Sequence, residues 1–312
     1  MMRVFTLKNT IIYIFWSFLV ALHWGCREAE EPAVAQIFEP ENISTGLVEY
    51  ATTFSTSGTE LYFAKSEGQW AKGDLKSTIY FSVKEHNQWS KPKMASFSGK
   101  YDDSAPHLTD EGRSLYFISN RPFGDSLPVS QDIWKVERDE QGAWGDPIRL
   151  DYPINSAQNE YGLVTDKEGN FYIASDREGG LGQGDIYIVK RQNDGYDHPV
   201  NLGEPINSEN GEWNMEVSQD GMAIIFEASQ RKQNLSSFGD LYISYKLEDK
   251  WSLPQNIEEV NTTGSDLYPE FLEGEEVLFY SSSDSLKSTV TNIYSIGFSS
   301  LYQKYKKRAV FP

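Results

Sequence analysis

An acidic residue recurs five times along the chain, at intervals of 52 to 57 residues. Each copy stands 13 or 14 residues before the last residue of a short apolar triplet such as LYF, and the five are Glu49, Asp103, Glu160, Glu212 and Asp266. Carboxylates repeated in this way can accept hydrogen bonds from neighbouring backbone, bind a cation or polar ligand, or hydrolyse glycosides. We expect the structural role first. Hydrolysis comes last, because it needs an acid and a base in different surroundings and a repeat shows no such asymmetry.

Further polar residues follow the repeated acids at intervals of two and four residues. His107, Glu216 and Glu270 each stand four residues after one of them. If the acids encircle the mouth of a central channel, these side chains continue down its wall. We therefore treat the five acids and these three residues as binding candidates. We predict no metal site and no cofactor, although crowded carboxylates leave a cation in the channel possible.

A second pattern pairs arginine with aspartate in three of the repeats. Arg121, Arg177 and Arg231 follow one predicted strand, and Asp132, Asp185 and Asp240 precede the next. The two remaining repeats lack both residues. Because a guanidinium matches a carboxylate bidentately, we predict that each Arg–Asp pair closes the base of a loop. The alternative is that three arginines grip an anionic ligand.

The glycine-rich run SDREGGLGQGDIY (175–187) is predicted to be a turn. A phosphate-binding loop would open a helix and carry Lys after its last glycine, whereas GDIYIV opens a strand. The alternating acids of a calcium loop are missing too. The chain also contains no GxSxG or HExxH motif. We predict no catalytic residue.

The repeats determine the predicted fold. Triplets ending at Phe63, Phe117, Ile173, Phe226 and Phe279 are 53 to 56 residues apart, and each unit holds four short strand-like runs separated by turn residues. This period in an all-strand pattern predicts a five-bladed β-propeller of four-stranded antiparallel blades over residues 33–300. The fifth unit lacks its outer strand, so we expect residues 33–38 to supply it and close the ring. Residues 301–311 are the competing choice, and otherwise 301–312 form a solvated tail.

These repeats resemble the TolB-like, WD-type propeller repeats of bacterial envelope proteins. The matching features are the SDREGG…GDIY run, the Asp-Gly turn before IIF and the INSxxNE junctions. The resemblance implies a propeller and a binding role, and it leaves the ligand open.

The N-terminus resembles that of a bacterial lipoprotein. Basic residues precede the apolar run IIYIFWSFLVAL, which is too short for a transmembrane helix and predicts a signal peptide over 1–25. Cys26, the only cysteine, follows it directly and is predicted to carry lipid, with 26–32 as an acidic tether. We expect an outer-membrane lipoprotein of a Gram-negative bacterium that faces the periplasm or the cell surface.

Charge narrows the predicted partners. The formal net charge is −18 and becomes −20 when residues 1–25, with Arg3 and Lys8, are removed. Such a surface repels nucleic acid. We predict a monomeric, non-enzymatic scaffold that is anchored to the membrane by its lipid. Its channel-mouth face is expected to bind an envelope protein or a polysaccharide. The alternative is a propeller hydrolase or lyase that acts on glycans with its channel-mouth carboxylates.

Overall fold

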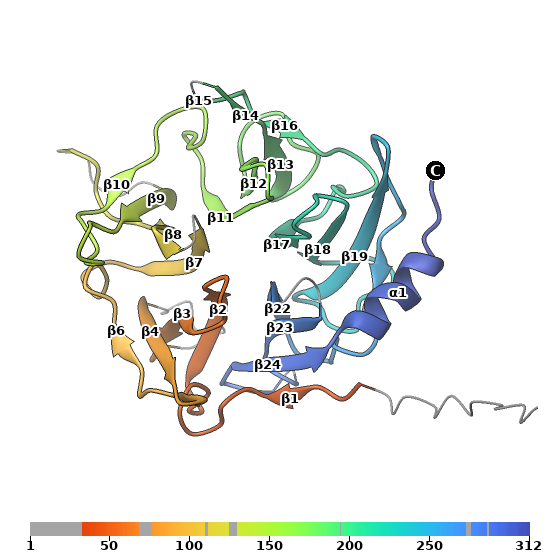
Figure 1. The fold of residues 1–312 in the computed structure, drawn as a ribbon. Helices are drawn as coiled ribbons and strands as arrows, with labels where there is room; N and C mark the ends of the chain where they lie inside the picture. Colours follow the sequence, from red (N-terminus) through yellow and green to blue (C-terminus); the bar gives the residue numbers. More distant parts are fainter. Residues whose placement is uncertain are drawn as a thin grey trace, which may run out of the picture. The chain divides into compact units, whose positions relative to one another are not determined.

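Five antiparallel sheets are arranged around a common axis, as the repeats predict (Figure 1). The first strand of each sheet faces the axis. These inner strands are β2 (Val48–Phe54), β7 (Asp103–Thr109), β11 (Glu160–Thr165), β17 (Glu212–Val217) and β22 (Asp266–Leu272). The second strands are β3 (Glu60–Ser66), β8 (Ser114–Ser119), β12 (Phe171–Ser175), β18 (Ala223–Ala228) and β23 (Val277–Ser282). The chain is therefore a five-bladed β-propeller.

The outer parts of the blades are less regular. The third strands are β4 (Ser77–Glu85), β9 (Asp132–Glu137), β13 (Asp185–Val189), β19 (Asp240–Leu247) and β24 (Asn292–Gly297). Two-residue strands pair with the third strands at the rim: β5 (Gln88–Trp89), β6 (Lys93–Met94), β10 (Ile148–Arg149), β16 (Val200–Asn201), β20 (Lys250–Trp251) and β21 (Gln255–Asn256). A separate hairpin consists of β14 (Arg191–Gln192) and β15 (Gly195–Tyr196).

The computed structural model describes residues 33–68, 76–109, 112–124, 130–193, 195–272, 276–285 and 287–312. The predicted signal peptide, Cys26 and the tether lie outside these ranges. Residues 33–312 form one compact unit. In the described part, no helix has the length and hydropathy that a membrane span requires.

The two ends of the propeller meet in the fifth blade. Strand β1 (Gln36–Ile37) pairs antiparallel with β24, so Gln36 lies opposite Ser295 and Ile37 opposite Tyr294. Phe38 extends this junction, and its ring packs edge-on against Phe279 with centroids 5.0 Å apart. The prediction that residues 33–38 close the ring is confirmed. Closure pairs a sheet edge that would otherwise be exposed.

The C-terminal segment is not the solvated tail that we predicted. Helix α1 (Ser299–Lys307) buries Leu301, Tyr302 and Tyr305 against the core cluster of the fourth and fifth blades. The hydroxyl of Tyr305 donates to Oε2 of Glu259 at 2.6 Å. The segment is rich in lysine, but Tyr302 stands three residues and Leu301 four residues before Tyr305, so at helical spacing the three side chains share one face.

Candidate functional site: the axial channel

The repeated acids are interior structural residues. All five side chains have no exposed surface, and each stands at or beside the first residue of an inner strand. Glu212 shows the usual arrangement: it accepts hydrogen bonds from the backbone N–H of Ser208 at 2.9 Å and from the hydroxyl of the same serine at 2.7 Å. Glu49, Glu160 and Asp266 bind Thr45, Ser156 and Thr262 in the same way. These acids therefore tie the segment between two blades to the inner strand.

The arginines complete these buried groups. Nη2 of Arg121 lies 2.7 Å from Asp103, that of Arg177 lies 3.3 Å from Glu160, and that of Arg231 lies 2.8 Å from Glu212. In blade one, Nζ of Lys65 takes the place of arginine, 3.0 Å from Glu49. Blade five has no such cation beside Asp266 among the described ion pairs, and burial raises the pKa of that carboxyl to about 6.

The prediction that each of these arginines pairs with the aspartate before the third strand is therefore wrong, because the arginines bind the buried acids instead. Asp132 is paired bidentately with Arg149 instead of Arg121, at 2.7 and 3.0 Å. Asp185 and Asp240 accept backbone N–H groups from the loops that precede them, as from Gly182 at 3.1 Å and Leu235 at 2.7 Å. Each arginine follows a second strand and binds the buried acid at the start of the inner strand, whereas each aspartate is the first residue of a third strand.

A β-bulge interrupts each inner strand just after its buried acid. The register shifts between Tyr50 and Thr53 in β2, and at the corresponding place in the other four inner strands. Four blades carry a non-glycine residue with positive φ there: Ala51, Ala105, Asn214 and Tyr268. A bulge re-aims the side chains beside it, and here all five bulges meet at the axis.

Three cavities follow one another along this axis. The entry cavity, about 340 Å³, lies where the inner strands begin and is lined by Tyr50, Ser77, Asp102, Ser104, Gln131, Tyr161, Trp213, Asn214, Glu227 and Tyr268. A small central cavity of about 30 Å³ shares Asn214 and Tyr268 with it. The exit cavity, about 460 Å³, shares His107 and Glu270 with the central one. None of the five buried acids lines any of the three.

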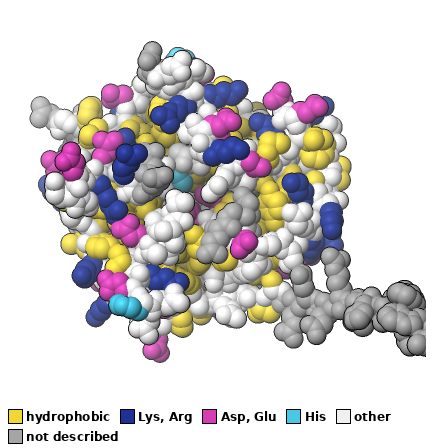
Figure 2. Space-filling model, in the orientation of Figure 1, with side chains coloured by type: hydrophobic (Ala, Val, Ile, Leu, Met, Phe, Trp, Pro, Cys, Tyr) yellow, Lys and Arg dark blue, Asp and Glu magenta, His cyan; other side chains and the backbone are white. Residues whose placement is uncertain are grey.

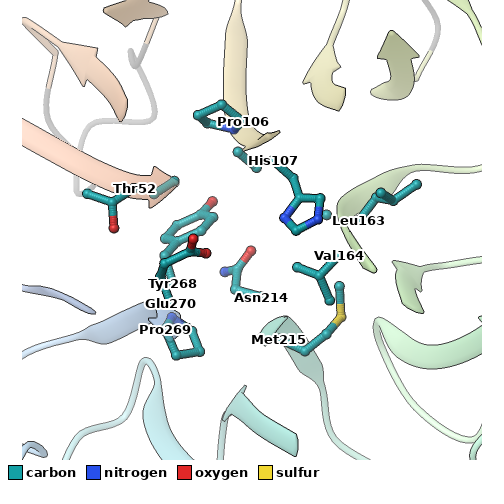
Figure 3. A pocket seen from close by; sticks show the side chains of 13 residues that line it. Thr52, Pro106, His107, Leu163, Val164, Asn214, Met215, Tyr268, Pro269 and Glu270 are labelled. Atoms are coloured by element: carbon teal, nitrogen blue, oxygen red, sulfur yellow. The ribbon is translucent and has the colours of Figure 1, made fainter. Parts of the chain in front are cut away.

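The central cavity brings together side chains that are far apart in the sequence (Figure 3). His107 and Glu270 face it from β7 and β22, beside Asn214, Tyr268 and Thr52. Glu216 lines the exit cavity together with His107 and Glu270. The structure thus places all three predicted channel-wall residues at the axis. The five acids that were expected to surround its mouth lie inside the blades.

The entry cavity contains two acidic side chains that were not among the site residues predicted from the sequence. Glu227 on β18 is 7% exposed, and burial raises its pKa to about 8. Its Oε2 accepts a hydrogen bond of 2.5 Å from Nδ2 of Asn214. Asp102 accepts the backbone N–H of Ser77 at 2.8 Å, and burial raises its pKa too. At neutral pH the Glu227 carboxyl therefore carries its proton.

Aromatic side chains surround these acids. Tyr50, Tyr161 and Trp213 each directly follow a buried acid, so strand alternation turns them toward the axis. The hydroxyl of Tyr161 donates to Asp176, and burial raises its pKa to about 12. Tyr268 is partly buried, and burial raises the pKa of its hydroxyl well above the ordinary value. The cavity thus combines apolar ring faces with a few convergent polar groups, as ligand sites do.

A signal for this cavity was present in the repeats. At the position of Glu227, directly after the apolar triplet, the other blades have Ala64, Ile118, Ala174 and Tyr280. Glu227 is thus the one charged residue at a position where the other four blades have an apolar or aromatic side chain. The face seen along the axis mixes acidic and basic side chains without a large patch of either sign (Figure 2).

No family model matches the chain, and no curated protein matches its sequence. Solved structures do match it in fold. One is a family 117 glycoside hydrolase from Zobellia galactanivorans, with TM-score 0.53 and 12% identity, covering 85% of this chain and 90% of that one. Another is an α-L-arabinofuranosidase from Lactobacillus brevis, with TM-score 0.51 and 14% identity, covering 81% and 92%. The chain is therefore a five-bladed propeller similar in fold to propellers of glycoside hydrolases.

Proposed function

We propose that this propeller binds a carbohydrate in its entry cavity and hydrolyses a glycosidic bond there. The observation that carries the proposal is the presence of two carboxyl groups, Glu227 and Asp102, in one aromatic-lined cavity on the axis. Their surroundings differ. Glu227 is buried and held by an amide, whereas Asp102 is only partly buried and accepts a backbone N–H. Two carboxyls in unlike environments are what glycoside hydrolysis requires.

The roles follow from protonation. Because burial raises the pKa of Glu227 to about 8, this side chain still carries its proton at neutral pH. It is therefore the general acid that donates the proton to the leaving oxygen. Asp102 is the carboxylate that either activates water or attacks the anomeric carbon. Tyr161 and Trp213 offer ring faces on which the apolar side of a sugar can rest. The fold that the chain shares with glycoside hydrolases supports this assignment.

The test is hydrolysis of a panel of aryl glycosides and oligosaccharides, including α-L-arabinofuranosides, by the purified full chain. We expect Glu227→Gln and Asp102→Asn each to lower kcat at least 100-fold while substrate binding persists. Glu137→Gln, an exposed acid on β9, is the matched control and should retain the rate. Turnover that is unchanged in Glu227→Gln would refute the assignment, and so would a wild-type chain that cleaves none of the panel.

A second candidate is the lipid-anchored envelope scaffold suggested by the TolB-like repeats and by Cys26. What favours it is a set of exposed apolar side chains in the loops between second and third strands, at the entry end of the channel: Phe123, Leu181, Leu235 and Phe238. Exposed apolar groups gathered on one face suit a protein partner. This candidate expects palmitate labelling that Cys26→Ala abolishes. It also expects an envelope partner that the wild-type chain captures and a Leu235→Ser, Phe238→Ser variant does not.

A further inference from the structure

Three side chains from three blades converge where the central cavity meets the exit cavity. They are His107 on β7, Glu216 on β17 and Glu270 on β22, and one potential ligand atom of each lies within 4.8 Å of the others. Each stands four residues after the buried acid of its own blade. The cluster is therefore a product of ring closure, because the blades present equivalent positions to one point on the axis.

This cluster is enclosed by protein. His107, Glu216 and Glu270 are 9%, 7% and 8% exposed. Nε2 of His107 lies 3.0 Å from Oγ1 of Thr165, a contact that orients the imidazole ring. Oε1 of Glu270 accepts the backbone N–H of Phe54 at 3.3 Å, and no Lys or Arg among the described residues forms an ion pair with Glu270. Adjacent buried carboxylates are costly unless a cation or a proton neutralises them.

A divalent ion suits this cluster electrostatically, because its charge of two balances the two carboxylates of Glu216 and Glu270.

A separate observation points to a ligand at the same place. Thr52 is 5% exposed and lines the central cavity with His107 and Glu270. Its Oγ1 is buried and has no hydrogen-bond partner among the described residues. Buried hydroxyls in native proteins are almost always satisfied, so an orphan in a cavity of this size indicates a bound water or ion-linked water.

We propose that His107, Glu216 and Glu270 hold one divalent transition-metal ion, of the Zn²⁺ or Mn²⁺ type, in the axial channel. One imidazole nitrogen with two carboxylate oxygens is a donor set for such ions, whereas Ca²⁺ and Mg²⁺ favour oxygen alone. Ligand bonds of about 2.0–2.2 Å place donor atoms roughly 3–3.5 Å apart. The donor atoms of the three side chains therefore need to move by only about 1 Å to complete the site. Water fills the remaining coordination positions. The site does not depend on the proposed hydrolysis.

The expected consequence is a brace across the axis. Bound metal links β7 of blade two, across the axis, to β17 and β22 of the neighbouring blades four and five. Binding to the folded state alone stabilises it in proportion to the logarithm of the metal concentration above Kd.

The test uses the full chain after treatment with chelator and dialysis. Calorimetric titration with Zn²⁺ and with Mn²⁺ should show one site per chain for at least one of them, together with a higher Tm. Glu216→Gln, Glu270→Gln and His107→Gln should each weaken binding at least ten-fold. Glu137→Gln is the matched control, because it makes the same substitution at an exposed residue of the third strand of blade two, and it should bind as the wild type does.

Two outcomes overturn the proposal: no stoichiometric binding up to millimolar metal, or binding that survives Glu216→Gln and Glu270→Gln unchanged. Glu270→Gln keeps the size and shape of the side chain and removes a buried charge, so this variant should fold. A readout without any variant is the proton NMR spectrum of the wild type with Co²⁺. It should show paramagnetically shifted signals from a single histidine ring, and their absence at saturating Co²⁺ would also overturn the site.

Discussion

Nη2 of Arg231 lies 2.8 Å from Oε1 of Glu212, a carboxylate with no exposed surface. The same guanidinium donates to the backbone carbonyl of Ile206, in the segment that enters the blade. One side chain thus neutralises a buried charge and fastens two stretches of chain. Arg177 repeats this with Glu160 and Ile154 in the preceding blade.

Replacing Arg231 should therefore destabilise the propeller. Arg231→Ala leaves Glu212 buried without its cation, and we expect the free energy of unfolding to fall by about 3 kcal/mol. Urea denaturation followed by tryptophan fluorescence measures this change. Lys232→Ala, at the exposed neighbouring residue, should shift the midpoint little. Equal midpoints for Arg231→Ala and the wild type would show that the pair contributes nothing.

The stability of the chain should depend on pH through Glu227. Its pKa is about 8 when folded and about 4.5 when unfolded, so between these values the folded state holds a proton that the unfolded state releases. The contribution of Glu227 is therefore complete below pH 4.5 and declines as pH rises to about 8, by at most about 1.4 kcal/mol per pH unit. Glu227→Gln removes this decline.

The measurement is a set of denaturation curves at pH values from 5 to 9 for both chains. The wild type should lose stability relative to Glu227→Gln as pH rises, and the difference should level off above pH 8. Parallel curves across the whole range would mean that the carboxyl is ionised in the folded state.

If Glu227 is the general acid, the rate of hydrolysis should depend on pH and decrease at alkaline pH. The rate should fall above pH 8 as Glu227 loses the proton that it must donate. It should also fall in acid, at a pH above the ordinary range for aspartate, because burial raises the pKa of Asp102. A pH profile of kcat/KM on the best substrate of the panel tests both limbs. A rate that keeps rising beyond pH 9 contradicts the role of Glu227.

The C-terminal helix should be part of the folded core. Tyr305 is 2% exposed; its hydroxyl binds Glu259 and accepts the N–H of Glu258 at 3.0 Å. Tyr305→Ala removes a packed ring and two hydrogen bonds, so we expect a loss of about 3–5 kcal/mol in unfolding free energy. Thermal unfolding checks it against Lys307→Ala, an exposed residue of the same helix. If both variants melt with the wild type, the helix is not part of the cooperative unit.

The fold could be predicted from the sequence because a propeller repeats the same pattern of strands and turns in each of its five blades. The repeated triplets that end at Phe63, Phe117, Ile173, Phe226 and Phe279 all lie in second strands of the blades, namely β3, β8, β12, β18 and β23. The ring closure by residues 33–38 followed from the strand that the fifth repeat lacks. Helix α1 was missed because it occurs once, so no internal copy reveals that its tyrosines are buried.

The candidate site could be predicted only in part. Spacing from the repeated acids placed His107, Glu216 and Glu270 on the channel wall, but it also assigned the acids themselves to the mouth, where the structure has Asp102 and Glu227. Sequence spacing fixes which residues are equivalent, since strand periodicity and blade period are local. It does not fix which way a carboxylate turns at a bulge, or which arginine reaches it. Those depend on the packing of side chains within each folded blade, and the cluster of His107, Glu216 and Glu270 exists only once the ring is closed.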